Sequence, residues 1–353
     1  MFTKISKPTI RLSAFRLSVG LSLLLSLTVS PAKASDSFIE TSSCDRNEAL
    51  TYKRAQKTNR LKLGLALGGG GARGAAEVGV LKVLDEAGVK FDYICGTSIG
   101  AVVGGFYALG ASPALMQKEF ENGNVMEHFM TVPLWFRVAI SPVLKVVNIF
   151  REKDYDGLYA GNRFRTYLMG KLTAHDQLIE NLPIPFAAVA LNVMDGKPYM
   201  IRKGNMGWAM QASSAVPTLR KPVELGDYLF CDGGLICNLP VKQCREMGAD
   251  VVIAINIDEP FTPLPKGQLT GFGSMAKRMI AWDLQDLDGP QSKFADLTIH
   301  PDTTGISLIS TKRKDAKRGV KAGEEAARDA LPAIKQLLSE CNIPLGLPPV
   351  RPK

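Results

Sequence analysis

The sequence is poor in the residues on which several common classes of protein depend. Its 353 residues include three histidines and six cysteines, and none of them stands at the paired spacing of a zinc site. Aromatic residues make up 7% of the chain, and no aromatic–basic motif of a nucleic-acid-binding module is present. There is no internal repeat or long low-complexity tract. These absences argue against a resident metal or other cofactor and against nucleic acid as a partner. A hydrophobic content of 46% is ample for a sizeable core.

The N-terminus has the pattern of a targeting segment. A basic head precedes the apolar run Leu17–Val29, which is too short for a comfortable membrane span, and Ala32-Lys33-Ala34 then fits the small-x-small cleavage rule. We therefore predict a signal peptide at 1–34 and export to the periplasm or beyond the cell; an uncleaved anchor is the less favoured alternative. Residues 1–34 hold five basic and no acidic side chains, so the formal charge falls from +9 to +4 on removal. Residues 35–60 read as a polar lead-in.

The stretch 61–109 contains two glycine-rich turns in one strand–helix–strand–helix pattern. The second turn, Gly96-Thr97-Ser98-Ile99-Gly100, follows the short apolar run Phe91–Cys95 and precedes the small-residue helix expected at Ala101–Leu109. Gly-x-Ser-x-Gly in this context predicts a nucleophile elbow, in which a sharp turn exposes the serine and needs small neighbours on either side. A tight turn without a catalytic role is the weaker interpretation. Ser98 is the predicted nucleophile.

The first turn, Gly68–Gly74, allows three interpretations. It fits the dinucleotide pattern G-x-G-x-x-G, but Asp92 begins the next strand instead of ending it, where the ribose contact is required. A phosphate-binding P-loop fails because no Lys-Ser or Lys-Thr closes the run. An oxyanion hole needs exposed backbone amides beside the nucleophile, and parallel strands would bring both turns to one edge of the sheet. Only the oxyanion hole accounts for both turns together.

The chain resembles the patatin-like phospholipases, a family of lipid acyl hydrolases, over about Lys62 to Ile257. The resemblance rests on GGGGARG, GTSIG and a later Asp-Gly-Gly, supplied here by Asp232, Gly233 and Gly234. It implies a three-layer α/β/α fold with a mainly parallel central sheet, and a catalytic domain that we place at 61–340. It also implies a Ser98–Asp232 dyad without histidine. The implied oxyanion hole consists of Gly69, Gly70 and Gly71 with Arg73. Gly74, Gly96 and Gly100 are further motif glycines, together with Gly233 and Gly234.

In the implied reaction, Ser98 attacks an acyl ester of a phospholipid or lysophospholipid, Asp232 serves as the base, and a fatty acid is released. Arg73 either adds positive charge or braces the loop. From the residues alone, a triad in the order Ser–Asp–His would use His300 instead. An acyltransferase with the same acyl-enzyme, and a lipid-binding protein without activity, are the alternative functions.

Several other segments leave alternatives open. The apolar stretch 120–150 is either a set of core helices or a lid that touches the membrane, and 261–310 is either a cover over the site or a surface insertion. We expect helices around Met275–Leu287 and over Lys312–Leu338, the latter kinked or divided at Pro332. Cys95 and Cys231 are expected to be buried thiols, a Cys44–Cys341 disulfide is a guess, and 341–353 reads as a Pro-rich tail. The oligomeric state stays open.

Overall fold

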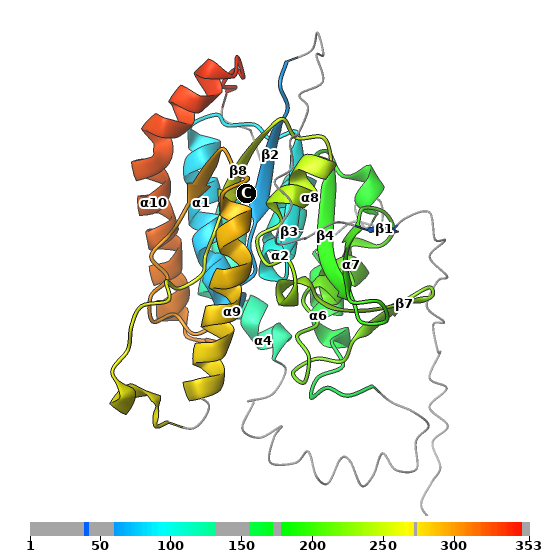
Figure 1. The fold of residues 1–353 in the computed structure, drawn as a ribbon. Helices are drawn as coiled ribbons and strands as arrows, with labels where there is room; N and C mark the ends of the chain where they lie inside the picture. The colour runs from blue at the N-terminus through cyan, green and yellow to red at the C-terminus, as the bar shows by residue number, and fades with distance from the viewer. Residues whose placement is uncertain (1–38, 42–59, 131–154, 172–177, 272–273, 348–353) are drawn as a thin grey trace, which may run out of the picture. The chain divides into compact units, whose positions relative to one another are not determined.

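A central β-sheet organises the structure, a computed structural model that describes residues 39–41, 60–130, 155–171, 178–271 and 274–347 (Figure 1). In these residues nine strands form one sheet, in which seven strands have the order β1-β5-β4-β3-β2-β8-β9. Strand β7 also pairs with β4, and β6 pairs with β7. The strands are β1 (Ile39–Thr41), β2 (Leu63–Leu67), β3 (Tyr93–Thr97), β4 (Phe186–Asn192), β5 (Lys197–Ile201), β6 (Val223–Leu225), β7 (Tyr228–Asp232), β8 (Val251–Ile255) and β9 (Leu297–Ile299).

The middle of the sheet is parallel, as predicted. Strands β4, β3, β2, β8 and β9 pair in parallel, whereas β1, β5, β6 and β7 are joined antiparallel. In the register, Thr97 at the end of β3 lies opposite Val189, and the next residue of β4, Ala190, lies opposite Asp232 at the end of β7. Strand β4 thus brings two segments that are far apart in the sequence to the same place.

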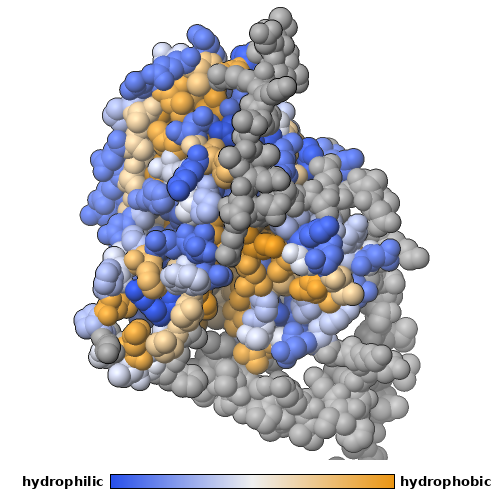
Figure 2. Space-filling model, in the orientation of Figure 1, coloured by the Kyte–Doolittle hydropathy of each residue, from blue (hydrophilic) through white to orange (hydrophobic). Residues whose placement is uncertain are grey.

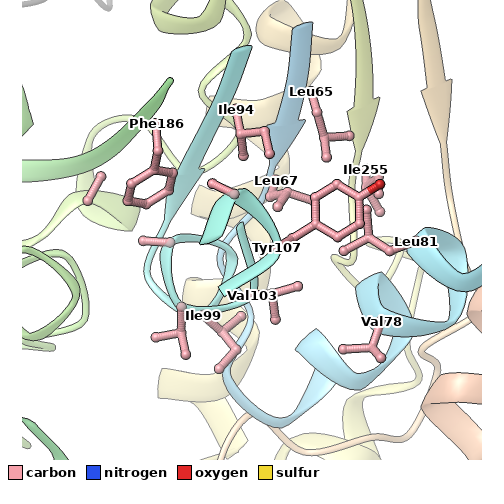
Figure 3. Close-up of a cluster of buried hydrophobic side chains, with 14 of the residues drawn as sticks. Leu65, Leu67, Val78, Leu81, Ile94, Ile99, Val103, Tyr107, Phe186 and Ile255 are labelled. Atoms are coloured by element: carbon pink, nitrogen blue, oxygen red, sulfur yellow. The ribbon is translucent and has the colours of Figure 1, made fainter. Parts of the chain in front are cut away.

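Helices cover both faces of the sheet. Alternate residues of β2 and β3 belong to two separate hydrophobic clusters, because successive side chains of a strand point to opposite faces. Leu65, Leu67 and Ile94 point toward α1 and α2 (Figure 3), and Ala66 and Cys95 pack with residues of α8 on the other face. This is the three-layer α/β/α arrangement.

The helices are mostly those that the hydrophobic spacing predicts. They are α1 (Gly74–Glu86), α2 (Ile99–Leu109), α3 (Pro113–Glu121), α4 (Asn124–Phe129), α6 (Asn162–Met169), α7 (Met206–Ser213), α8 (Val241–Glu246), α9 (Ser274–Ser292) and α10 (Arg313–Glu340).

Helix α10 continues through Pro332, so the proline does not divide it. The expected inward residues Val320 and Ile334 are buried, and Ala326, Ala330 and Leu337 are partly buried against the same core. Ala327 and Leu338 are buried beside them. This face of α10 packs along α1.

Part of what the sequence predicts lies outside the described residues. This holds for the signal peptide, for Cys44, and for 131–154, which form most of the apolar stretch 120–150. Residues 120–129 are described, and Phe120, Val125 and Met126 are buried in the core. In the part of the chain that the structure describes, no helix is long and apolar enough to cross a membrane.

Candidate functional site

Ser98 stands in a strained turn between β3 and α2. Its backbone has φ 54° and ψ −119°, a conformation that residues with a Cβ rarely adopt. Gly96 and Gly100 make the turn sterically allowed: a Cβ on Gly96 would collide with the carbonyl of Gly100, and one on Gly100 would lie 2.6 Å from the carbonyl oxygen of Gly68. The local geometry is that of the predicted elbow.

The serine meets Asp232 across β4. Ser98 Oγ donates a hydrogen bond to Asp232 Oδ2 at 2.7 Å, and the amide of Gly234 donates to Asp232 Oδ1 at 2.8 Å. The amide of Ser98 donates to Ser213 Oγ at 2.9 Å, and this hydrogen bond helps to fix the backbone of the turn. Ser98 and Asp232 are 9% and 5% exposed, which removes most competing water from their hydrogen bond.

Burial changes the acidity of Asp232. Loss of water raises its pKa to about 6, although the hydrogen bonds from Ser98 and Gly234 and the charge of Arg220 act in the opposite direction. Asp232 is therefore ionised at neutral pH, yet it is a stronger base than an ordinary aspartate. A base whose pKa lies near the working pH is the better proton acceptor.

The glycine loop lies against the serine, and its amides are not equivalent. The amide of Gly69 donates to the carbonyl of Asn238 at 3.2 Å, so it is occupied, unlike in the predicted oxyanion hole. The amides of Gly70 and Gly71 have no acceptor among the described residues. A Cβ on Gly69 would lie 3.2 Å from that of Ser98, which shows how close the loop comes to this serine.

The side chain of Arg73 binds two segments that lie next to the glycine loop, at Ile306 and Glu259. Its Nε donates to the carbonyl of Ile306 at 2.8 Å and its Nη2 to Glu259 Oε2 at 2.7 Å. The side chain is 4% exposed and does not belong to the described residues that line the catalytic pocket. These contacts favour the bracing role over a direct charge on the reacting oxygen.

Three further motif glycines permit close packing. A Cβ on Gly74 would meet Ile99 next to the nucleophile, and one on Gly233 would meet the carbonyl of Val189 in β4. One on Gly234 would lie 3.0 Å from both Asp232 Oδ1 and Asn238 Oδ1. The absence of a Cβ at these three glycines therefore allows close packing next to Ser98 and Asp232.

Two polar arrangements at the site were not predicted. Asn238 donates from Nδ2 to Asp288 Oδ2 at 2.8 Å and to Asp258 Oδ2 at 3.3 Å, and the amide of Leu239 donates to Asp288 Oδ1 at 2.8 Å. Burial, followed by the charge of Asp258, raises the pKa of Asp288, and burial also raises the pKa of Asp258. Asn238 begins the segment Asn-Leu-Pro-Val, a short distance after the Asp-Gly-Gly motif, whereas Asp288 had no sequence signal.

Arg220 is the second unpredicted group. It is 2% exposed, lies 4.4 Å from the ring centre of Phe129 and 4.7 Å from that of Phe164, and its Nε and Nη1 find no acceptor among the described residues. Burial lowers the pKa of Arg220 to about 9, and the charge of Asp232 opposes that change. It remains a cation at neutral pH and lowers the pKa of Asp232.

The dyad opens into an apolar pocket with a volume of about 300 Å³. Ser98, Asp232, Gly70 and Gly71 lie in its lining, and the walls are mainly hydrophobic side chains. Helix α9 supplies Ile280 and Leu284, so part of 261–310 forms a wall of the site. Further apolar lining comes from Val102, Val125, Met126, Phe129, Phe164, Val216, Leu219, Leu235, Leu308 and Ile309.

Neither of the two histidines that the structure describes, His128 and His300, is part of this arrangement. His300 follows β9 and is not among the described lining residues, and both oxygens of Asp232 already accept hydrogen bonds from Ser98 and Gly234. His128 stacks on Tyr167 and bonds to the carbonyl of Asn124, and His175 lies outside the described residues. The described residues hold no cluster of three or more potential metal ligands.

The cysteines next to the motifs are buried free thiols, as expected. Cys95 and Cys231 are 0% and 3% exposed, and burial raises the pKa of Cys231 to about 12. A thiol with so high a pKa is protonated at neutral pH and is a poor nucleophile.

Comparison with known proteins gives a consistent family match. A model of patatin-like phospholipases matches residues 65–245, which is more than half of the chain. An uncharacterized NTE family protein of Mycobacterium tuberculosis is 30% identical over 302 residues, covering 78% of this chain and 47% of that protein. Patatin-like phospholipase domain-containing protein 6 of Mus musculus is 30% identical over 228 residues, covering 62% of this chain and 15% of that protein. The chain thus spans about half the length of these relatives or less.

Two solved structures show a partial similarity to this chain. VipD from Legionella pneumophila has a TM-score of 0.43 and 15% identity, with 78% of this chain and 67% of that chain covered. Human GIVD cytosolic phospholipase A2 has a TM-score of 0.41 and 11% identity, with 80% and 59% covered.

Proposed function

The chain belongs to the patatin-like phospholipase family, and on that premise we propose that it hydrolyses carboxylic esters of phospholipids or lysophospholipids. The observation that carries the proposal is the 2.7 Å hydrogen bond from Ser98 Oγ to Asp232 Oδ2 at the base of an apolar pocket. A serine hydroxyl is a weak nucleophile until a base takes its proton, and this contact supplies that base.

In the proposed reaction, Ser98 Oγ attacks the ester carbonyl while Asp232 takes its proton. The tetrahedral oxyanion accepts hydrogen bonds from the amides of Gly70 and Gly71, for which the described part of the chain supplies no other acceptor. When the intermediate collapses, Asp232 returns the proton to the leaving alcohol and the acyl group stays on Ser98. Asp232 then deprotonates a water molecule that attacks the acyl-enzyme. The free fatty acid leaves and Ser98 regains its proton.

The test is hydrolysis of p-nitrophenyl butyrate and of a labelled phospholipid in the presence of a chelator and without an added alcohol acceptor. We expect Ser98→Ala and Asp232→Asn to lose activity and His300→Ala to keep it. Loss of activity in folded His300→Ala equal to that in Ser98→Ala would instead indicate a triad. An unmutated protein that releases no fatty acid would favour the acyltransferase or the lipid-binding alternative.

We also propose contact with a lipid surface through α9. Met275, Met279 and Trp282 recur at helical spacing on one side of this helix and are 55%, 52% and 47% exposed. Figure 2 shows hydrophobic residues over the lower left of the molecule, where Figure 1 draws the lower part of α9. Ile280 is 49% exposed and also lines the catalytic pocket, so the apolar side is continuous with the mouth of the site.

Sedimentation with phosphatidylcholine vesicles tests this contact in the Ser98→Ala protein. The double variant Met279→Ser with Trp282→Ser should sediment less. Leu347→Ser, at a residue that is 84% exposed elsewhere, should sediment like the parent. Equal sedimentation of all three would contradict the contact.

Export remains part of the proposal, supported by the basic head, the apolar run and the cleavage pattern of 1–34. N-terminal sequencing of the protein from the periplasm or the medium should begin at Ser35. Recovery of the full-length chain from the cytoplasm would argue against it.

A further inference from the structure

A second cavity, larger than the catalytic pocket, lies beside it. Its volume is about 570 Å³, compared with about 300 Å³ for the catalytic pocket. The lining residues come from α2, α3, α4 and α6, and most of them are hydrophobic, including Phe106, Leu109 and Met116. A concave, mainly apolar space of this size is typical of a site that binds a small hydrophobic molecule or part of one.

The two cavities meet at Val102 and Val125, which line both. Val102 belongs to α2, the helix that begins at Ser98, and Val125 belongs to α4; both are 5% exposed or less. Figure 1 shows α4 between α9 and α6 in this view. These two side chains form the boundary between the nucleophile's pocket and the second cavity.

The second cavity follows the axis of α2 away from the nucleophile. Its lining includes Val102, Val103, Phe106 and Leu109. At a rise of 1.5 Å per residue, these positions lie about 6–17 Å beyond Ser98 along the helix. An acyl chain that is attached at Ser98 and runs along α2 would therefore pass along this wall of the cavity.

The charges in the lining are already paired. Among the described lining residues, Glu119 accepts hydrogen bonds from Tyr167 at 2.6 Å and from Lys171 at 2.9 Å. Burial alone would raise the pKa of Glu119, but these hydrogen bonds and one from Asn124 lower it, so the carboxylate is ionised and faces Lys171. The pair leaves no net charge to attract a phosphate or a carboxylate, and the apolar walls suit an uncharged hydrocarbon chain.

We infer that this cavity holds the distal part of a long acyl chain whose ester carbonyl lies at Ser98, with Val102 and Val125 as the passage between the two spaces. The inference rests on the proposed ester hydrolysis and adds a chain-length preference to it. Short acyl groups fit within the catalytic pocket, and long ones extend past the two valines along α2.

The test fills the second cavity without touching the catalytic pocket. Ala111 and Leu115 line only the second cavity and are both partly exposed, so Ala111→Phe and Leu115→Trp should fold. Ala333→Phe, at an exposed position of α10, is the matched control. The measurement is the ratio of kcat/KM for p-nitrophenyl palmitate to that for p-nitrophenyl butyrate.

We expect Ala111→Phe and Leu115→Trp each to lower this ratio about tenfold or more, the effect of keeping at least two methylene groups out of an apolar site. Ala333→Phe should keep the parent ratio. A parent ratio in both cavity variants, with hydrolysis intact, would overturn the inference and leave the proposed function standing.

A binding measurement separates the two ideas. The Ser98→Ala protein is titrated with the methyl ester of cis-parinaric acid, a fluorescent and uncharged acyl ester. Weaker binding by at least tenfold on adding Ala111→Phe, but not Ala333→Phe, supports the cavity even if the parent hydrolyses no ester and the proposed function fails. Equal binding in both would overturn the cavity assignment.

Discussion

The strain at Ser98 predicts an unusual order of stabilities when its side chain is removed. Ser98→Ala and Ser98→Gly both delete the hydroxyl and its hydrogen bond to Asp232, so they differ only in the Cβ. A residue with a Cβ at φ 54° and ψ −119° carries roughly 1–3 kcal/mol of backbone strain, which glycine relieves. In the opposite direction, glycine gives the unfolded chain more conformational entropy than alanine, which lowers the stability of Ser98→Gly by about 0.4–1 kcal/mol. Ser98→Gly should therefore be the more stable by about 0.5–2 kcal/mol.

Urea unfolding followed by circular dichroism measures this difference in the free energy of unfolding. At about 2–4 °C per kcal/mol, the melting temperature of Ser98→Gly should exceed that of Ser98→Ala by about 1–8 °C. The control is Ser339, an exposed residue within α10, where glycine should be less stable than alanine by about 0.5–1 kcal/mol. The same order at Ser98 as at Ser339 would refute the strain argument. Neither variant of Ser98 should hydrolyse an ester.

Four further predictions concern Asp232, its neighbour Arg220 and the turn at Gly100. Asp232→Asn should lower kcat/KM for p-nitrophenyl butyrate by about 10²–10⁴-fold, the usual contribution of a general base; a loss below tenfold would exclude that role. In the unmutated protein kcat/KM should fall as the pH drops through about 6, because protonation of Asp232 removes the base. Arg220→Met should move this midpoint to higher pH, since the charge of Arg220 lowers the pKa of Asp232; an unchanged pH profile would contradict the coupling. Gly100→Ala should destabilise the fold by about 1–3 kcal/mol in urea unfolding, because the added Cβ would collide with the carbonyls of Leu67 and Gly68, whereas Gly289→Ala, with open space around it, should not destabilise it. Equal effects at the two glycines would contradict this packing.

Much of the sheet could be predicted because its strands are short apolar runs between turn residues. The apolar runs at 61–67, 185–194 and 250–258 are typical of buried strands, and they correspond to β2, β4 and β8. The two glycine-rich turns were also readable, because glycine at a tight turn has a local steric cause. Parallel pairing then follows from the intervening helices and places both turns at one edge.

The rest depends on contacts between distant residues, which no local pattern records. Whether the amide of Gly69 is free depends on the carbonyl of Asn238, which approaches it from another segment. Asp288 comes to the site from the middle of α9, and its side chain is indistinguishable in the sequence from a solvated helix residue. Arg220 likewise looks like a surface cation until the fold buries it against Phe129 and Phe164.

Helix α10 shows the same limit on a smaller scale. Its hydrophobic spacing predicts an inward face, and Val320, Ile334 and Leu337 of that face do pack against the core. The spacing does not show how close α10 comes to α1. A Cβ on Gly79 would collide with the carbonyl of Val320, and one on Gly323 with the carbonyl of Ala76, so these glycines allow the two backbones to approach.

The central claim is that Ser98 is a nucleophile activated by Asp232, and covalent labelling tests it most directly. A fluorophosphonate reacts with an activated serine, and peptide mass spectrometry then identifies the modified residue. We predict modification at Ser98 in the unmutated protein, at a rate at least 100-fold lower in Asp232→Asn and unchanged in His300→Ala. Labelling at another serine such as Ser213 or Ser214, or an undiminished rate in Asp232→Asn, would contradict the account.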